Sequence, residues 1–243
     1  MKHGMQATLA LLLQQALDEE MALAADLASA ERCAEGTAVD WSAKDTMAHV
    51  GAWKERLVRD LDDGQSGTLL AQEDIGAVNQ RIFDQTRGLT WPDVLALLRT
   101  GSTDLIARVR TLSDMSQSGE QPTAGAGIRP LWRRVVGIGY IHSLTHISQL
   151  RIGRGQSRLA VSLSEGMVES LLQLDDSPHW RGELLYDLAC TYALAGEVDR
   201  ALETLAEALR LQPELFEWSR TDPDFASIRS QPAYQALYST EVA

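Results

Sequence analysis

Residues 130–154, PLWRRVVGIGYIHSLTHISQLRIGR, are the stretch that decides the fold. Pro130 suits the first position of a helix, where its missing N–H is no loss, and Gly153 is a typical stop. The residues between them are largely apolar, so they predict one long helix. His142 and His146 lie one turn apart on it, and both imidazoles therefore leave the same face. This spacing indicates a bidentate metal site, a pair of acid–base groups, or two packed and hydrogen-bonded core histidines.

The composition is typical of a helical protein that does not bind nucleic acid. Of 243 residues 44% are apolar and 6% aromatic, and 34 Asp and Glu outweigh 22 Lys and Arg to give a net charge of -12. This balance opposes binding to a phosphate backbone or to an anionic membrane surface. Two cysteines far apart in the chain predict no disulfide framework. With no signal-peptide pattern and no membrane-length apolar run, we expect a cytoplasmic protein without nucleic-acid or membrane partners.

The chain before this stretch predicts amphipathic helices joined by loops. Apolar residues recur at helical spacing. Ser42 is a good N-cap with Asp45 in the capping-box position, and Thr90 is a cap with Pro92 just inside the following helix. No strand-like alternation persists, so the fold is predicted to be all-α. The helices are expected at residues 5–32, 41–61, 72–87 and 90–112.

Residues 113–128, SDMSQSGEQPTAGAGI, form a Gly-, Ser- and Pro-rich segment directly before the histidine-bearing helix. Loops of more than about 12–15 residues are usually functional or disordered. We interpret this one as a lid over a site, with a plain tether as the alternative.

His49 lies in the middle of the second predicted helix and offers a third ligand. Helix-bundle interiors are a usual place for metal sites, and three neutral imidazoles with open positions are the ligand set of a catalytic ion. Such an ion lowers the pKa of a bound water or thiol, or polarises a substrate carbonyl. Zn²⁺, Ni²⁺, Mn²⁺ and Fe²⁺ all accept three histidines, and the spacing does not choose among them. Core packing of the three rings stays the alternative.

Two motifs resemble a known family. WSAKDTMAHVGAWKERL, at 41–57, and HSLTHISQLRIGRG, at 142–155, are similar to the DinB-like superfamily and, within it, to the ClbS/DfsB branch. The resemblance covers roughly residues 5–158. It implies a four-helix bundle in which His49, His142 and His146 hold a divalent metal. Members are thiol-dependent transferases and isomerases, or hydrolases that protect against reactive metabolites, so a low-molecular-weight thiol is a candidate cofactor.

Other residues near these motifs are candidates for binding or catalysis. Trp53 is expected either to pack in the core or to wall a pocket near the metal. Gln149, one turn beyond His146, could hydrogen-bond a ligand or a metal-bound water. Arg133 and Arg134 flank a helix N-terminus, which favours anions, and could bind the carboxylates of a thiol cofactor or substrate. As exposed residues they should matter more for binding than for folding; solvated arginines paired with surface acids are the alternative.

Residues 182–213, GELLYDLACTYALAGEVDRALETLAEALRLQP, resemble a tetratricopeptide repeat. Small Ala189 and Ala201 allow two helices to approach, Gly196 makes the turn, and Pro213 ends the second helix. A single repeat cannot bury its own face, so flanking helices are expected to cover it. Such modules bind peptides or mediate self-association; simple packing on the bundle is the alternative.

The sequence therefore predicts a DinB-like bundle over residues 1–158 and a TPR-like helical module over residues 159–243. The leading hypothesis is a metal-dependent enzyme that acts on a small reactive electrophile by hydrolysis or thiol transfer, as in detoxification. One alternative is a non-catalytic protein that sequesters a small molecule in the bundle cavity. The other is an adaptor that works through the repeat module.

Overall fold

The computed structural model describes residues 2–62, 74–112 and 130–239 of the chain. Within these ranges the chain forms helices and turns and contains no β-strand, which confirms the all-α prediction. The segment interpreted as a lid, residues 113–128, lies outside the described residues.

Contacts between residues divide the chain into two compact units, 1–146 and 147–243. The division falls inside the helix that carries His142 and His146, earlier than the domain boundary predicted between residues 158 and 159. The domain boundary expected at residues 158 and 159 stays a prediction.

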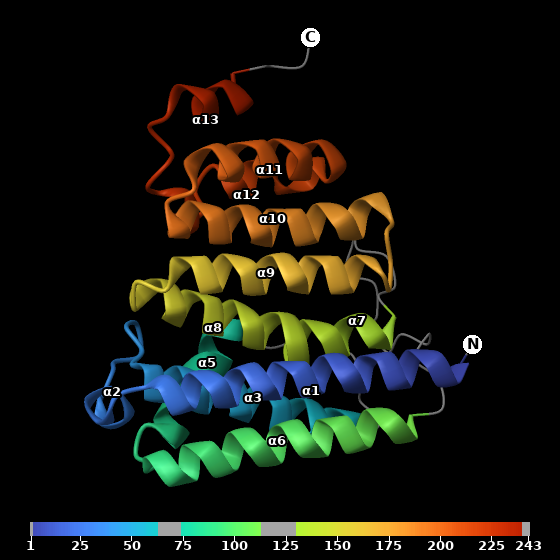
Figure 1. The fold of residues 1–243 in the computed structure, drawn as a ribbon, viewed down its shortest axis with the longest axis vertical. Coiled ribbons are helices and arrows are strands. Elements are labelled where there is room, and N and C mark those ends of the chain that lie inside the picture. Colours follow the sequence, from blue (N-terminus) through green and yellow to red (C-terminus); the bar gives the residue numbers. More distant parts are fainter. Residues whose placement is uncertain (1, 63–73, 113–129, 240–243) are drawn as a thin grey trace. The chain divides into compact units, whose positions relative to one another are not determined.

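The first unit is built from long helices that pack along their lengths. In Figure 1, α1 and α6 run side by side, and α3 packs extensively on α6. The short π-helical segment η1 contacts both α1 and α3. The elements are α1 (Lys2–Asp26), α2 (Ser29–Cys33), α3 (Ala43–Asp62), α5 (Ile75–Thr86), α6 (Trp91–Thr111), α7 (Leu131–Val136), η1 (Gly137–Ile141) and the start of α8 (His142–Gly153).

Helix starts in this unit follow the predicted caps. The Asp45 carboxylate accepts hydrogen bonds from the Ser42 backbone N–H at 3.0 Å and from the Ser42 hydroxyl at 2.6 Å, and the Asp45 N–H lies 3.2 Å from Ser42 Oγ. Thr90 and Asp93 make the same reciprocal box at the start of α6, with Pro92 inside the first turn. Both boxes satisfy N–H groups that a helix start leaves without partners.

Two glycines allow α3 and α6 to pack closely. A Cβ on Gly101 would lie 2.9 Å from the Gly51 carbonyl oxygen, and a Cβ on Gly51 would lie 3.0 Å from the backbone N and Cα of Leu98. Backbone atoms move aside less easily than the end of a side chain, so a larger residue at Gly101 would force a backbone shift and one at Gly51 would push the helices slightly apart. The close approach fixes α3, and with it His49, against α6.

The leucines that recur at helical spacing near the N-terminus, in α1 and just after it, lie in the core. Each of them is less than 9% exposed: Leu9, Leu12, Leu13, Leu17, Leu23 and Leu27. The expected helix over residues 5–32 is interrupted, however, because α1 ends at Asp26 and α2 begins at Ser29. Glu31 stabilises the start of α2 by accepting a hydrogen bond from the Ala28 N–H at 2.7 Å.

The second unit continues α8 with a series of antiparallel helices. Figure 1 shows α9, α10 and α11 stacked in chain order, and both neighbouring pairs make many contacts. Gly196, at φ +82°, ends α10 in the left-handed conformation that glycine adopts without strain. The elements are α9 (Ser157–Leu172), α10 (Pro178–Ala195), α11 (Val198–Leu211), η2 (Pro213–Leu215), α12 (Phe216–Ser219), η3 (Pro223–Phe225) and α13 (Pro232–Leu237).

Among the described residues, none of the helices combines the length and apolar character needed to cross a lipid bilayer.

Candidate metal centre

A π-helical turn positions the first histidine of the C-terminal pair. The stretch predicted as one long helix is α7, then η1, then α8, and the His142 N–H bonds to the Gly137 carbonyl five residues earlier. A Cβ on Gly139 would lie 2.4 Å from Leu13 Cδ2 and 2.8 Å from Leu105 Cδ2, so this glycine lets η1 approach α1 and α6. A π-helical turn adds one residue to the helix and changes which residues face a neighbour, and such turns are frequent at functional sites.

The three candidate histidines converge through the same ring atom. Nε2 of His142 lies 3.0 Å from Nε2 of His49 and 3.1 Å from Nε2 of His146. His49 comes from α3, and the other two come from the first turns of α8. The structure thus brings the three predicted ligands together within one unit, although His49 and His142 are 93 positions apart in the chain.

Hydrogen bonding alone does not account for this convergence. A ring nitrogen has one in-plane position, which carries either a proton or a lone pair. Nε2 of His142 has two nitrogen neighbours at hydrogen-bond distance, but it can form a well-aligned hydrogen bond with only one of them. Three lone pairs directed at one ion satisfy all three nitrogens together. Ligand nitrogens about 2.0–2.1 Å from a common ion lie about 3.0–3.4 Å apart, close to the spacing found here.

Tryptophan rings enclose the imidazoles. The Trp41 ring lies 4.2 Å from the His49 ring and 6.2 Å from the His146 ring, measured between centroids. Trp53 lies 6.2 Å from His49 and 6.0 Å from His142, and its Nε1–H donates to Asn79 Oδ1 at 3.1 Å.

Burial favours the neutral form of two of the three candidate ligands. Desolvation, followed by the charge of His146, lowers the pKa of His49 from 6.5 to about 3. Desolvation also lowers the pKa of His142 well below 6.5, and the neighbouring histidines and Lys54 add to this effect. A neutral imidazole is the form that binds a metal ion, so these two rings are ready to ligate at neutral pH.

The outer ring nitrogens lack the support that metal-bound histidines usually have. Nδ1 of His49 and Nδ1 of His142 are buried and have no hydrogen-bond partner among the residues that the structure describes. Ligating histidines usually donate Nδ1–H to a carboxylate or a carbonyl, which sets the tautomer. Here packing against Trp41 and Trp53 orients the rings, and an ion on Nε2 would itself select the Nδ1–H tautomer.

A buried ion pair lies close to the histidines and was not predicted. Lys54 Nζ pairs with Glu20 from α1 and donates to Ser102 Oγ on α6 at 2.9 Å. The side chains of Lys54 and Glu20 are 1% and 0% exposed. Burial lowers the pKa of Lys54, and Glu20 opposes that shift. A lysine five residues after His49 reads in sequence as a solvated helical residue, so no local signal reveals its partners.

The remaining predicted site residues fall in different surroundings. Trp53 is 7% exposed and walls the histidine cluster, which fits both of its expected roles. Gln149 is exposed on α8, and its catalytic role stays a prediction. Arg133 is half-buried with its guanidinium 5.4 Å from the Trp132 ring centroid. The expectation that Arg134 is exposed is wrong, because it is buried and pairs with Asp60 at 2.5 Å.

Trp41 lies against the histidine cluster, a position that the sequence analysis did not predict for it. Its Nε1–H donates a hydrogen bond to the Ala38 carbonyl at 3.2 Å, just before α3 begins. Its ring nevertheless makes the closest aromatic contact to His49. The sequence could have indicated this contact, since Trp41 is the first residue of the motif that contains His49.

A second group of metal-binding residue types in the other unit has a structural explanation. Donor atoms of Cys190, Asp222 and Asp224 lie within 4.8 Å of one another. Asp222 accepts the Tyr186 hydroxyl at 2.7 Å and the Asp224 N–H at 3.0 Å. Burial also raises the pKa of Cys190, so the thiol stays protonated and is a poor ligand.

Comparison with protein-family models, with functionally characterised proteins and with solved structures gives no significant match.

Proposed function

We propose that this chain is a DinB-like, metal-dependent enzyme that acts on a small reactive electrophile by hydrolysis or thiol transfer. His49, His142 and His146 would hold one divalent ion, with Zn²⁺, Ni²⁺, Mn²⁺ and Fe²⁺ as the candidates. A low-molecular-weight thiol is the candidate co-substrate. Cellular protection against reactive metabolites is the role that fits this chemistry.

One observation carries the proposal. Three Nε2 atoms converge in a partly buried position, and the central one has two nitrogen neighbours at 3.0 and 3.1 Å. The set contains three imidazoles and no carboxylate, so a bound divalent ion would keep its full charge and open coordination positions. Such an ion activates a bound water or thiolate, or polarises a carbonyl.

The protein contributes the surroundings of that ion. Trp41 and Trp53 flank the imidazoles, limit the access of water and offer flat apolar surfaces to a substrate. The Lys54 charge disfavours protonation of His142, which helps to keep that ligand neutral as pH falls.

We further propose that α10 and α11 form a TPR-like repeat that binds a peptide or mediates self-association. The two helices pack through Ala189 and Ala201, which are both fully buried, and the left-handed Gly196 makes the turn between them. Capture of a partner that is lost on removal of this unit is the test of this second role.

Metal analysis of protein purified without a histidine tag tests the enzyme proposal. Wild-type protein should hold close to one equivalent of a divalent metal, and His49→Ala, His142→Ala and His146→Ala should each lose most of it. His179→Ala is the matched control, because His179 is exposed in the other unit and should leave the metal content unchanged. A double variant should lose little beyond either single one, since the three ligands act as a unit.

Fluorescence provides a readout independent of activity. Trp41 and Trp53 lie within about 6 Å of the imidazoles, so binding of paramagnetic Ni²⁺ or Mn²⁺ should quench tryptophan emission in wild-type protein and not in His142→Ala. Wild-type protein that retains none of the four metals after loading would overturn the metal proposal.

Turnover separates catalysis from sequestration. The loaded protein should accelerate hydrolysis of an activated ester or attack of a thiol on a chlorodinitrobenzene, and His→Ala variants should lose this activity with their metal. Metal-loaded protein that binds electrophiles in stoichiometric amounts without turnover would favour sequestration.

A further inference from the structure

Asn79 of α5 bonds to the tryptophan that lies against two of the candidate metal ligands. The Nε1–H of Trp53 donates to Asn79 Oδ1 at 3.1 Å. The centroid of the Trp53 ring lies 6.2 Å from that of His49 and 6.0 Å from that of His142, and both contacts are T-shaped. A shift or rotation of the indole would therefore change the space that surrounds both imidazoles.

The chemistry of the two groups fixes how they meet. An indole N–H can donate a hydrogen bond and cannot accept one, so the oxygen of the Asn79 amide, and not its nitrogen, must face Trp53. The Trp53 side chain is 7% exposed, and a buried N–H without an acceptor is strongly unfavourable. The hydrogen bond thus ties the indole to one position along α5. A residue without an acceptor at position 79 would release it.

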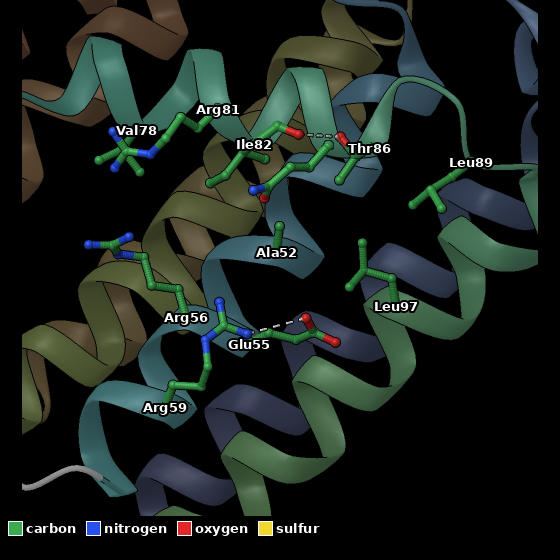
Figure 2. Close-up of a pocket in the computed structure, with 11 residues that line it drawn as sticks. Ala52, Glu55, Arg56, Arg59, Val78, Arg81, Ile82, Thr86, Leu89 and Leu97 are labelled. Atoms are coloured by element: carbon green, nitrogen blue, oxygen red, sulfur yellow. Dashed lines mark hydrogen bonds and ion pairs between the residues drawn. The ribbon is translucent and has the colours of Figure 1, made fainter.

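Apolar packing gives this ring no preferred direction. Val78 and Ile82 of α5 are 1% and 7% exposed and form an apolar cluster with Trp53, and Figure 2 shows them above the part of α3 that carries Ala52. A pocket of about 360 Å³, lined in part by Val78 and Ile82, opens between α3, α5 and the N-terminal part of α6. Apolar contacts are not directional, and open space beside them leaves room for a shift. The hydrogen bond to Asn79 supplies the direction that these contacts lack.

The position of the indole matters because two of the imidazoles have little other support. Histidines that bind metal usually donate Nδ1–H to a carboxylate or a carbonyl, which sets the orientation of the ring. Nδ1 of His49 and Nδ1 of His142 are buried and have no hydrogen-bond partner among the residues that the structure describes. Trp53 contacts both rings, so an aromatic wall limits their rotation where a hydrogen bond usually would.

We propose that Asn79 is a positioning residue of the metal centre and acts on it through Trp53. This inference rests on the proposed function, because it concerns the ion that His49, His142 and His146 would hold. The bond to Asn79 keeps the indole against two of the three imidazoles, and the indole keeps their Nε2 atoms directed at one point. Loss of the bond would widen the range of ring orientations and weaken metal binding, although every ligand would still be present.

Hydrogen exchange of the Trp53 indole N–H tests the contact in the full-length protein after metal removal. The signal is assigned in a heteronuclear NMR spectrum by its loss in Trp53→Phe. In Asn79→Leu this hydrogen should exchange with solvent at least tenfold faster than in wild type, because the bond that protects it is gone. Asn79→Asp keeps an acceptor oxygen and should keep the slow exchange. Equal rates in wild type and Asn79→Leu would overturn the proposal.

Gln80→Leu is the matched control for this variant. Gln80 is the next residue of α5, and its exposed amide donates to Asp84 at 3.2 Å. The substitution therefore replaces an amide by the same apolar side chain without touching Trp53. Exchange of the indole N–H in Gln80→Leu should match wild type, and an equally large acceleration there would refute the specific role of Asn79.

Competition with a chromophoric chelator measures the consequence for the metal centre. Removal of a group that orients metal ligands typically lowers affinity 10–100-fold, so Asn79→Leu should bind Zn²⁺ about tenfold more weakly than wild type. It should still bind one equivalent at saturation, and its circular dichroism should match the wild type. Asn79→Asp should recover most of the affinity, and Gln80→Leu should not change it.

The two ways in which these experiments can fail are distinct. Wild-type affinity for Zn²⁺ in Asn79→Leu, together with fast indole exchange, would show that Trp53 does not position the ligands and would refute this inference alone. Wild-type protein that binds none of the four candidate ions would refute the proposed function and this inference together.

Discussion

The buried pair between Lys54 and Glu20 allows a quantitative test of the structure. Lys54→Met removes the ammonium and keeps a side chain of similar length. The Glu20 carboxylate would then be buried at 0% exposure with Ser102 Oγ, 3.4 Å away, as its polar neighbour. Removing one partner of a buried pair costs about 3–5 kcal/mol, because the other charge stays buried and uncompensated. For a chain of this size such a loss corresponds to roughly 6–20 °C in Tm.

Urea unfolding followed by circular dichroism measures this loss, and a double-mutant cycle separates the pair from its surroundings. Glu20→Leu with Lys54→Met replaces both charges by apolar groups, and it should recover most of the stability lost in either single variant. If the two compact units unfold in separate transitions, the change should be confined to one of them. A loss below about 1 kcal/mol in Lys54→Met, with no coupling in the cycle, would show that the pair is solvated and that α1, α3 and α6 pack differently.

Three other variants or conditions test particular contacts. Arg134→Gln should lower the free energy of unfolding by about 2–4 kcal/mol because it leaves the buried Asp60 carboxylate without its ion-pair partner. Arg133→Gln should lower it by less than about 1 kcal/mol. Equal small losses in urea unfolding would contradict the pairing. Gly51→Ala should lower the free energy of unfolding by about 1–3 kcal/mol because the new methyl group forces α3 and α6 apart. Gly166→Ala in α9, where a Cβ meets nothing within 4 Å, should raise it by about 0.5–1 kcal/mol. A gain in stability at both positions would exclude the close approach. In metal-free protein the pKa of His49 falls from 6.5 to about 3 on folding, so below pH 6.5 the unfolded chain binds more protons than the folded one. The free energy of unfolding should therefore drop by up to about 1.4 kcal/mol for each unit that the pH falls. A His49→Ala variant with the same slope between pH 6.5 and 4 would refute this origin.

The grouping of His49, His142 and His146 was predictable because its signals are local. His142 and His146 share one face of a helix by spacing alone, and His49 stands in a motif that also contains Trp41 and Trp53. Capping boxes such as Ser42 with Asp45 are short-range hydrogen-bond patterns, so the starts of α3 and α6 followed from a few consecutive residues. The turn at Gly196 followed in the same way.

The π-helical turn was not predictable from the same stretch. The sequence of residues 130–154 predicts one continuous helix. Gly137 and Gly139 did not by themselves indicate that the helix would change from α to π geometry there. It lies where the backbone at Gly139 comes close to Leu13 and Leu105 from two other helices, which is a tertiary contact. Periodicity describes one helix at a time and contains no information about those neighbours.

Charge is where sequence and tertiary structure differ most in this protein. By itself, the sequence determined the all-α fold class, the caps of α3 and α6, the leucine stripe of α1 and the shared face of His142 and His146, because each depends on residues within a few turns of one another. Tertiary structure decided that Lys54 and Arg134 are buried with Glu20 and Asp60, and that three other arginines line a pocket. The physical reason is that the free energy of a charged side chain depends on desolvation and on partners from distant segments, and neither can be read from its sequence neighbours.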